Sequence, residues 1–172
     1  DETQKGDSLL FIGLTNFGKK VINRCNELGI MVDVSHSGEQ TFFDIIETTT
    51  KPIIASHTSV YNICPHFRNL KDNQLMAIKE NGGVVFVNFY PGYIDSTFEA
   101  KAASVKESFK SQLDSLAKLH DPDGDEYWYK ESQIMNADLK KVVPDVDAVI
   151  DHIDYIAKLI GVDHVGIGAD WD

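Results

Sequence analysis

The feature that most restricts the fold of this chain is a pattern that occurs twice: a short apolar run that ends at a histidine. Residues 30–34 lead into His36, and residues 52–55 lead into His57. The segment between them, residues 39–50, is long enough for one helix. Apolar runs rich in β-branched residues that flank a helix-length segment indicate a parallel βαβ unit. Because parallel strands point the same way, both histidines are expected at the carboxyl edge of the sheet, where α/β proteins place their active sites.

The composition restricts the class of protein. With 172 residues, of which 42% are hydrophobic, the chain can form one globular domain with a buried core. A net charge of -11 argues against a nucleic-acid partner, since such proteins neutralise phosphates with clustered Lys and Arg. No apolar run approaches the roughly 20 residues that cross a bilayer. Cys25 and Cys64 are too few for a disulfide framework, and the compartment, extracytoplasmic or cytoplasmic, stays open.

Helices and strands are expected to alternate along the rest of the chain. We expect a loop over the first dozen residues and an acidic, aromatic surface loop at residues 121–136. Helices are expected at residues 15–28, 39–48, 72–80, 94–119 and 145–160, and strands at residues 30–34, 52–55, 84–89 and 164–168. The spacing in the first helix predicts one buried face formed by Phe17, Val21, Cys25 and Leu28.

Four strands, each preceded by a helix, correspond to about half of a (β/α)8 barrel, which typically needs about 250 residues. The predicted fold class is therefore α/β, a partial TIM barrel of about four βα units. Residues 94–143 are expected to be a helical and loop insert. A self-contained open sheet is the alternative, although no Gly-rich phosphate loop follows any of the predicted strands.

Three side chains at predicted strand ends are candidates for catalysis. Adjacent parallel strands lie about 5 Å apart, so His36 and His57 could bind one metal ion, for which zinc is the first candidate. The alternative is that each histidine only completes a turn. Asp170 has the equivalent position after the last strand, where a carboxylate could bind metal or transfer a proton. On spacing alone, an aspartate that caps the strand end is an equal alternative.

Arginine usage indicates a binding residue. Of 16 basic residues only Arg24 and Arg68 are arginine, and a planar guanidinium suits bidentate binding of a carboxylate. Arg68, which follows the second histidine run, is the better candidate.

Two apparent metal motifs are rejected. His152 and Asp154 lie in a predicted helix, where a separation of two residues rotates side chains by about 200°, so they cannot chelate and are expected on a solvated face. Residues 121–125 lack the glycine position and terminal glutamate of a calcium loop and are predicted to be an acidic surface turn.

At these positions the sequence resembles the membrane (renal) dipeptidase family of zinc metallopeptidases, which belong to the amidohydrolase-like barrels of metal-dependent hydrolases. The matching segments occur in the family's order and cover nearly the whole chain; they are residues 13–19, 32–36, 56–59, 68–69, 82–90 and 164–172. By this resemblance, residues 1–172 would be the carboxyl-terminal portion of a single dipeptidase domain.

The resemblance implies roles for the candidate residues. His36 and His57 would be ligands of one zinc in a two-zinc site, Arg68 would hold the substrate's terminal carboxylate, and Asp170 would contact the substrate and assist proton transfer. The implied reaction is hydrolysis of a dipeptide, with a D-residue tolerated at the carboxyl end, in a protein that is often a homodimer.

The resemblance also implies missing parts and leaves alternatives open. The family's amino-terminal His-x-Asp pair, its bridging glutamate and a further substrate-binding histidine have no match, so these 172 residues alone are expected to be inactive. The alternatives are an amidohydrolase that acts on another amide or a lactam, and a non-catalytic binding domain that retains the barrel.

Overall fold

The computed structural model describes residues 12–170, so the loop expected at the start of the chain lies outside the described residues, as do Trp171 and Asp172. The chain divides into two compact units. One contains the chain up to Ser96 together with the part from Val146 onward, and the other is Thr97–Asp145. The second unit overlaps the segment that was expected to be an insert.

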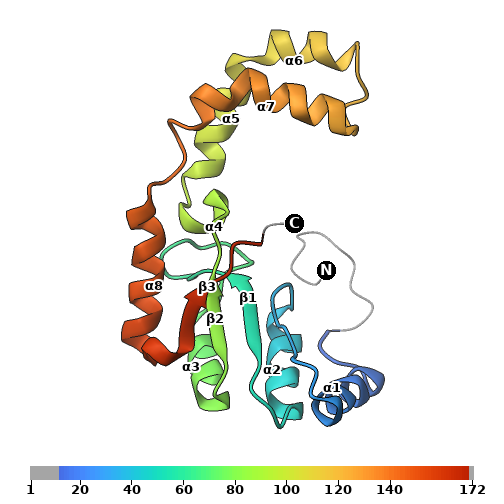
Figure 1. Cartoon of the computed structure of the whole chain (residues 1–172), viewed down its shortest axis with the longest axis vertical. Helices are drawn as coiled ribbons and strands as arrows, with labels where there is room; N and C mark the ends of the chain where they lie inside the picture. Colours follow the sequence, from blue (N-terminus) through green and yellow to red (C-terminus); the bar gives the residue numbers. More distant parts are fainter. Residues whose placement is uncertain (1–11, 171–172) are drawn as a thin grey trace. The chain divides into compact units, whose positions relative to one another are not determined.

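The first unit is built on a parallel sheet with the strand order β1-β2-β3. The strands are β1 (Ile54–Thr58), β2 (Val84–Val87) and β3 (Val165–Ile167). All three point upward in Figure 1, so their carboxyl ends share one edge. The predicted mixed α/β class is confirmed.

The expected strand at residues 30–34 is reduced to a single parallel bridge between Asp33 and Ile54. Val34 N–H donates to Ile54 O at 2.8 Å, but the ladder stops there. The next donor, Ser56 N–H, is bound at 3.1 Å by the Asp33 carboxylate instead of a backbone carbonyl. The Asp33 side chain thus replaces a backbone acceptor, and the pairing of residues 30–34 with β1 ends one residue before His57.

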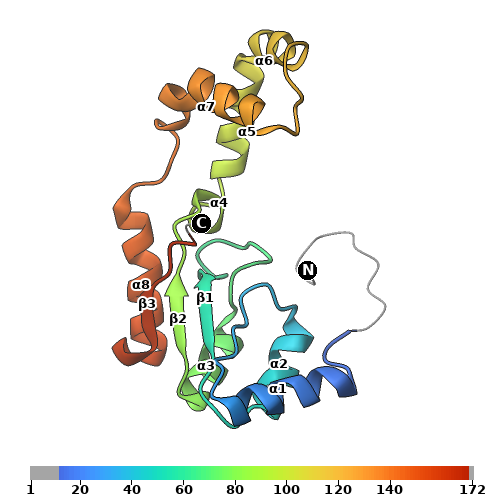
Figure 2. The same ribbon diagram turned by 45° about the vertical axis from the view of Figure 1, so that its right-hand side comes forward.

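The helices of the first unit surround this sheet. They are α1 (Asn16–Leu28), α2 (Glu39–Thr48), α3 (Asp72–Asn81), α4 (Pro91–Ile94), α8 (Val146–Ile160) and the 3-10 turn η1 (Val162–His164). Helix α1 packs on α2, α2 on α3, and α3 on α8 (Figure 2). The core between these helices and the strands contains Phe42, Ile45, Ile53, Leu75, Ile78, Val85, Val87, Ile156 and Ile160.

Helix α1 has the predicted ends but not the predicted buried face. Thr15 accepts a hydrogen bond from Gly18 N–H at the start, and Gly29 adopts a left-handed conformation at the end. Ile22, however, is the buried residue of this helix, and Phe17 is 75% exposed. Periodicity locates an apolar stripe correctly, but it does not show whether a neighbour covers that stripe.

The second unit differs from its predicted structure. The prediction of a single helix at residues 94–119 is wrong, because the segment contains separate helices: the end of α4, then α5 (Phe98–Ser108) and α6 (Lys110–Ala117). The loop expected at residues 121–136 is also wrong for most of its length, since α7 (Asp125–Leu139) follows a short turn. Asp125 and Glu126 lie in the first turn of α7, where carboxylates are favourable.

The expectation for His152 needs correction. The side chain is fully buried instead of solvated: Nδ1 accepts from Val60 N–H at 2.9 Å, and Nε2 lies 3.1 Å from Ile94 O. The exposed Asp154 pairs with Lys158 one turn further along α8. No helix among the described residues has the length and apolar character needed to cross a membrane.

Candidate active site

His36 and His57 meet at the carboxyl edge of the sheet, as predicted. Their Nε2 atoms are 2.9 Å apart, and their ring centroids are separated by 5.0 Å. Two nitrogens that bind one tetrahedral zinc at about 2.0–2.1 Å lie about 3.3 Å apart. The two imidazoles therefore present adjacent donor atoms at a spacing that a small outward shift would fit to a shared metal ion.

Asp170 also reaches this edge, with Oδ2 3.8 Å from His57 Nε2. Gly168 makes the approach of the chain possible. A Cβ at this position would lie 1.9 Å from Ser56 O, which no side chain can tolerate. Gly168 thus lets the backbone after β3 lie directly against β1.

His36 and Asp170 each have a strained, left-handed backbone conformation. Their φ angles are 79° and 56°, and they are the non-glycine residues with positive φ among residues 12–170. Such conformations cost of order 1–3 kcal/mol and concentrate at functional sites, where surrounding structure enforces them. This strain supports a functional role for both residues independently of their distances.

The surroundings of both histidines lower their pKa values and so favour the neutral imidazole. Burial lowers the pKa of His36, and the positive charge of Arg68 lowers it further. Burial also lowers the pKa of His57 and outweighs the opposing effect of the Asp170 carboxylate. Neutral imidazole is the form that binds metal ions.

Arg68 lies on the irregular segment after β1 with one edge of its guanidinium unused. Nη1 donates to Tyr93 OH at 3.2 Å, and Cζ lies 5.3 Å from the centroid of that ring. Nε and Nη2 are buried and have no hydrogen-bond partner among the described residues. These two atoms form the side of the guanidinium that binds a carboxylate through two parallel hydrogen bonds. Buried donors in proteins are normally hydrogen-bonded, and a carboxylate has the two acceptor oxygens that would pair with both atoms.

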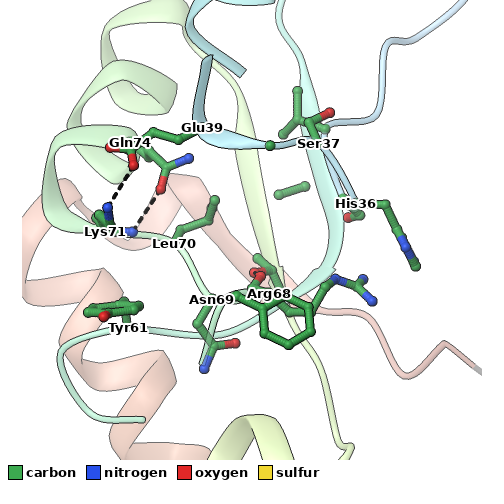
Figure 3. Close-up of a pocket in the computed structure, with 15 residues that line it drawn as sticks. His36, Ser37, Glu39, Tyr61, Arg68, Asn69, Leu70, Lys71 and Gln74 are labelled. Carbon is green, nitrogen blue, oxygen red and sulfur yellow. Dashed lines mark hydrogen bonds and ion pairs between the residues drawn. The ribbon is translucent and has the colours of Figure 1, made fainter. Parts of the chain in front are cut away.

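A cavity of about 330 Å³ connects the histidine and arginine positions. Figure 3 shows His36 and Arg68 toward one end of it and the hydrogen-bonded group of Glu39, Lys71 and Gln74 toward the other. Lys71 Nζ lies 2.6 Å from Glu39 Oε2 at that end. The volume is at the lower end of the range of about 300–1,000 Å³ that is usual for small-molecule sites.

Sequence reasoning missed two kinds of residue in this site. Asp33 and Ser56 contact each other beside His57, and the signal for Asp33 was a lone charge inside an apolar run. Tyr93 and Asn69 organise the arginine segment: Asn69 Nδ2 donates to Tyr93 O at 2.8 Å. No signal in the sequence indicated that contact, because it joins residues far apart in the chain.

The described residues contain no group of three or more His, Cys, Asp or Glu side chains placed to hold a metal ion by themselves. Within these residues His36 and His57 form a pair, and their role as ligands of one metal stays a prediction. The pair fits a metal in donor type and spacing, but a complete site needs further ligands.

Comparison with known proteins identifies the family. The model of the membrane dipeptidase family, peptidase family M19, matches residues 2–172, and the chain therefore belongs to this family. A relative, the dipeptidase aclJ of Aspergillus oryzae, is 31% identical over 93% of this chain.

Solved structures of a probable dipeptidase and of a metallopeptidase are similar to this chain. The probable dipeptidase PvdM from Pseudomonas aeruginosa superposes with a TM-score of 0.67 at 27% identity over 93% of this chain. A metallopeptidase from Rhodobacter sphaeroides, solved with a phosphinate mimic of the dipeptide L-Ala-D-Ala, superposes with a TM-score of 0.64 at 25% identity over 94% of this chain. The chain spans 28% of the length of the Aspergillus relative, and 43% and 35% of the two solved chains.

Proposed function

We propose that the full-length protein that carries this chain is a zinc-dependent dipeptidase. Its substrates are dipeptides with a free carboxyl-terminal carboxylate, and D-residues are accepted at that end. The observation that carries the proposal is the His36–His57 pair together with Arg68, whose Nε and Nη2 have no partner among residues 12–170; His36 and Arg68 line one cavity. Membership of the M19 family and the dipeptide mimic in the Rhodobacter metallopeptidase support it.

The substrate specificity would come from Arg68. Its Nε and Nη2 would each donate one hydrogen bond to the terminal carboxylate, and Tyr93 would hold the guanidinium in place through Nη1. A substrate without that carboxylate would leave two buried donors unpaired, which is costly. The arrangement therefore favours a dipeptide over a longer peptide or an amide that lacks a carboxylate at this distance.

The hydrolytic chemistry would divide between a metal and Asp170. His36 Nε2 and His57 Nε2 would hold one zinc. The remaining ligands of this zinc, and the ligands of the second zinc, would come from outside residues 12–170. When bound, zinc would polarise the peptide carbonyl and make a water acidic enough to attack near neutral pH. Asp170 would accept the proton of that water at a carboxylate oxygen and return it to the leaving amine.

The test compares each dipeptide with its carboxyl-terminal amide in wild type and in Arg68→Lys. Wild type should prefer the free dipeptide strongly. Arg68→Lys keeps the charge but loses the two-bond fork, so kcat/KM for the dipeptide should fall about 100- to 1,000-fold, equivalent to about 3–4 kcal/mol, with little change for the amide.

Arg24→Lys is the matched control, because the only other arginine forms an exposed pair with Glu27 on α1. It should leave both rates unchanged. Equal wild-type rates for the dipeptide and the amide would contradict the proposed specificity and favour an amidohydrolase with another substrate. Matched substrates with L- or D-alanine at the carboxyl end test the stereochemical part.

A further inference from the structure

A chain of hydrogen bonds connects His57 to Asp33 through the Ser56 hydroxyl. Ser56 Oγ lies 2.8 Å from His57 Nδ1 and also donates to Asp33 Oδ2 through a short hydrogen bond. The nitrogen involved, Nδ1, is the one that does not face His36. The chain therefore contacts His57 from the side opposite the proposed metal.

The Asp33 carboxylate can only accept in this arrangement. Burial raises its pKa, but hydrogen bonds from Ser56 and Ser35 more than offset this effect, and the pKa lies below its ordinary value. Its Oδ1 accepts from Ser35 N–H at 2.9 Å and from Ser56 N–H at 3.1 Å. Its Oδ2 accepts from the Ser56 hydroxyl.

A count of hydroxyl protons fixes the direction of the remaining bonds. A serine hydroxyl has one proton and two lone pairs, and Ser56 uses its proton on Asp33. Toward its other neighbours it can only accept. Ser35 Oγ, which itself accepts from His57 N–H at 3.0 Å, lies 3.3 Å away and can donate to Ser56 Oγ. The remaining lone pair of Ser56 faces His57 Nδ1, so that nitrogen must carry the proton.

We infer that Asp33 and Ser56 are positioning residues that hold His57 as its Nδ1–H tautomer and so keep a lone pair on Nε2 for the metal. In a neutral imidazole one nitrogen donates and the other accepts, and the partner of the first determines which. The metal-binding role rests on the function proposed above, whereas the tautomer does not.

The expected effect on metal binding is large enough to measure. Residues that orient a metal-binding histidine through its second nitrogen typically contribute 10- to 100-fold to metal affinity. The same bonds fix the plane of the ring, since Ser56 is itself held by both Asp33 oxygens through its N–H and its hydroxyl.

The first test measures the tautomer directly in the full-length, metal-free protein. Histidine is labelled with 15N, and spectra are recorded above the ordinary histidine pKa of about 6.5. The His57 signals are assigned by their loss in His57→Ala. In wild type and in Ser56→Thr, Nδ1 should be protonated and Nε2 not; in Ser56→Ala the Nε2–H form should appear. Asp33→Asn should also favour the Nε2–H form of His57. The new amide N–H can donate to Ser56 Oγ, so the Ser56 hydroxyl would donate its own proton to His57 Nδ1 instead.

The second test measures zinc affinity by competition with a chelator. Ser56→Ala should bind zinc about 10- to 100-fold more weakly than wild type, and Ser56→Thr should restore the affinity. Ser59→Ala is the matched control, since the Ser59 hydroxyl is buried nearby in the chain but has no hydrogen-bond partner among residues 12–170.

A wild-type His57 that is mainly Nε2–H, or a Ser56→Ala variant with unchanged tautomer and unchanged zinc affinity, would overturn the inference. If Ser56→Ala does not fold, the wild-type and Ser56→Thr spectra still decide the tautomer. A protein that shows the predicted tautomer but hydrolyses no dipeptide would refute the proposed function alone.

Discussion

His36 and Asp170 adopt left-handed backbone conformations that most L-residues avoid, and Gly168 has no room for a side chain. All three features lie at the same sheet edge, and each lowers stability or restricts the choice of residue. They place one imidazole and one carboxylate beside His57. The local geometry is therefore explained better by the needs of a binding site than by the needs of folding.

Gly168→Ala tests this account of the strand end. Its Cβ would overlap the carbonyl oxygen of Ser56, so the variant should lower the free energy of unfolding by about 1–3 kcal/mol or more, measured by urea denaturation of the full-length protein. It should also weaken zinc binding, because relief of the overlap displaces Ser56 and Asp170. Gly18→Ala, in α1, is the control: its Cβ would lie 3.1 Å from Cδ2 at the flexible end of the Leu14 side chain and in ordinary contact with Thr15 Oγ1, 3.7 Å away, so stability should stay unchanged or rise by about 0.5–1 kcal/mol. Equal stability of the two variants would contradict the role of Gly168.

At the residue scale, the sequence indicated candidate side chains that follow a pattern along the chain. It did not indicate hydrogen bonds between residues that are distant in the chain. His36 and His57 were found because both follow apolar runs one crossover apart. Arg68 was selected as a candidate because arginine is rare here, and its binding role stays a prediction. The bond of Arg68 to Tyr93 depends on how the segment after β2 folds back, and no local pattern specifies that.

Helix α8 connects two elements of the candidate site through His152. The imidazole accepts from Val60 N–H, at the start of the segment that carries Arg68, and contacts Ile94 O, at the end of α4. Helix α4 contains Tyr93, the hydrogen-bond partner of Arg68. One buried neutral side chain thus satisfies a backbone donor and a backbone acceptor from two segments that both contact the arginine.

His152→Leu should lower the free energy of unfolding by about 2–5 kcal/mol at neutral pH, since it leaves the Val60 N–H and the Ile94 carbonyl unpaired. The pH dependence should change as well. Burial lowers the pKa of His152 despite the opposing effects of the Ile94 hydrogen bond and of Asp151. Below the unfolded-state pKa of about 6.5, the unfolded chain binds a proton that the folded state resists, so this contribution to stability falls as the pH falls.

Urea denaturation of the full-length protein between pH 7.5 and 5.5 measures both effects. The His152→Leu curve should be flatter than the wild-type curve, by up to about 1.4 kcal/mol per pH unit. His120→Leu, which removes a histidine paired with Glu126 in the second unit, should have a small effect. A parallel pH dependence of wild type and His152→Leu would show that His152 is not the buried neutral group described here.

At the element scale, capped helices were predicted well and helix breaks were not. Helix α1 starts after Thr15 and ends before Gly29. The Thr15 side chain accepts from a backbone N–H of its first turn, and the Gly29 N–H donates to backbone carbonyls of its last turn. The break at Phe109 has no Pro or Gly to indicate it, and periodic apolar residues continue across it. Helix α7 was missed because its aromatic and acidic residues resemble a surface loop, although Tyr127 and Met135 are buried.

At the scale of the whole molecule, the fold class could be predicted from the sequence, but the complete active site could not be predicted. Parallel strands with helical crossovers were predicted from periodicity, and the M19 family match agrees with them. The chain covers 28–43% of the relatives described above, and its described residues place two imidazoles and one carboxylate at the sheet edge. Further ligands for the proposed metal site would therefore have to come from outside residues 12–170.

Metal analysis of the purified full-length protein tests the central claim most directly. If the proposed pair holds one of two zinc ions, zinc measured by mass spectrometry should be near two per chain in wild type and near one or lower when His36 and His57 are both replaced by Ala. A wild-type protein purified with zinc available that contains none, or a double variant that keeps the full zinc content, would contradict the assignment of this histidine pair.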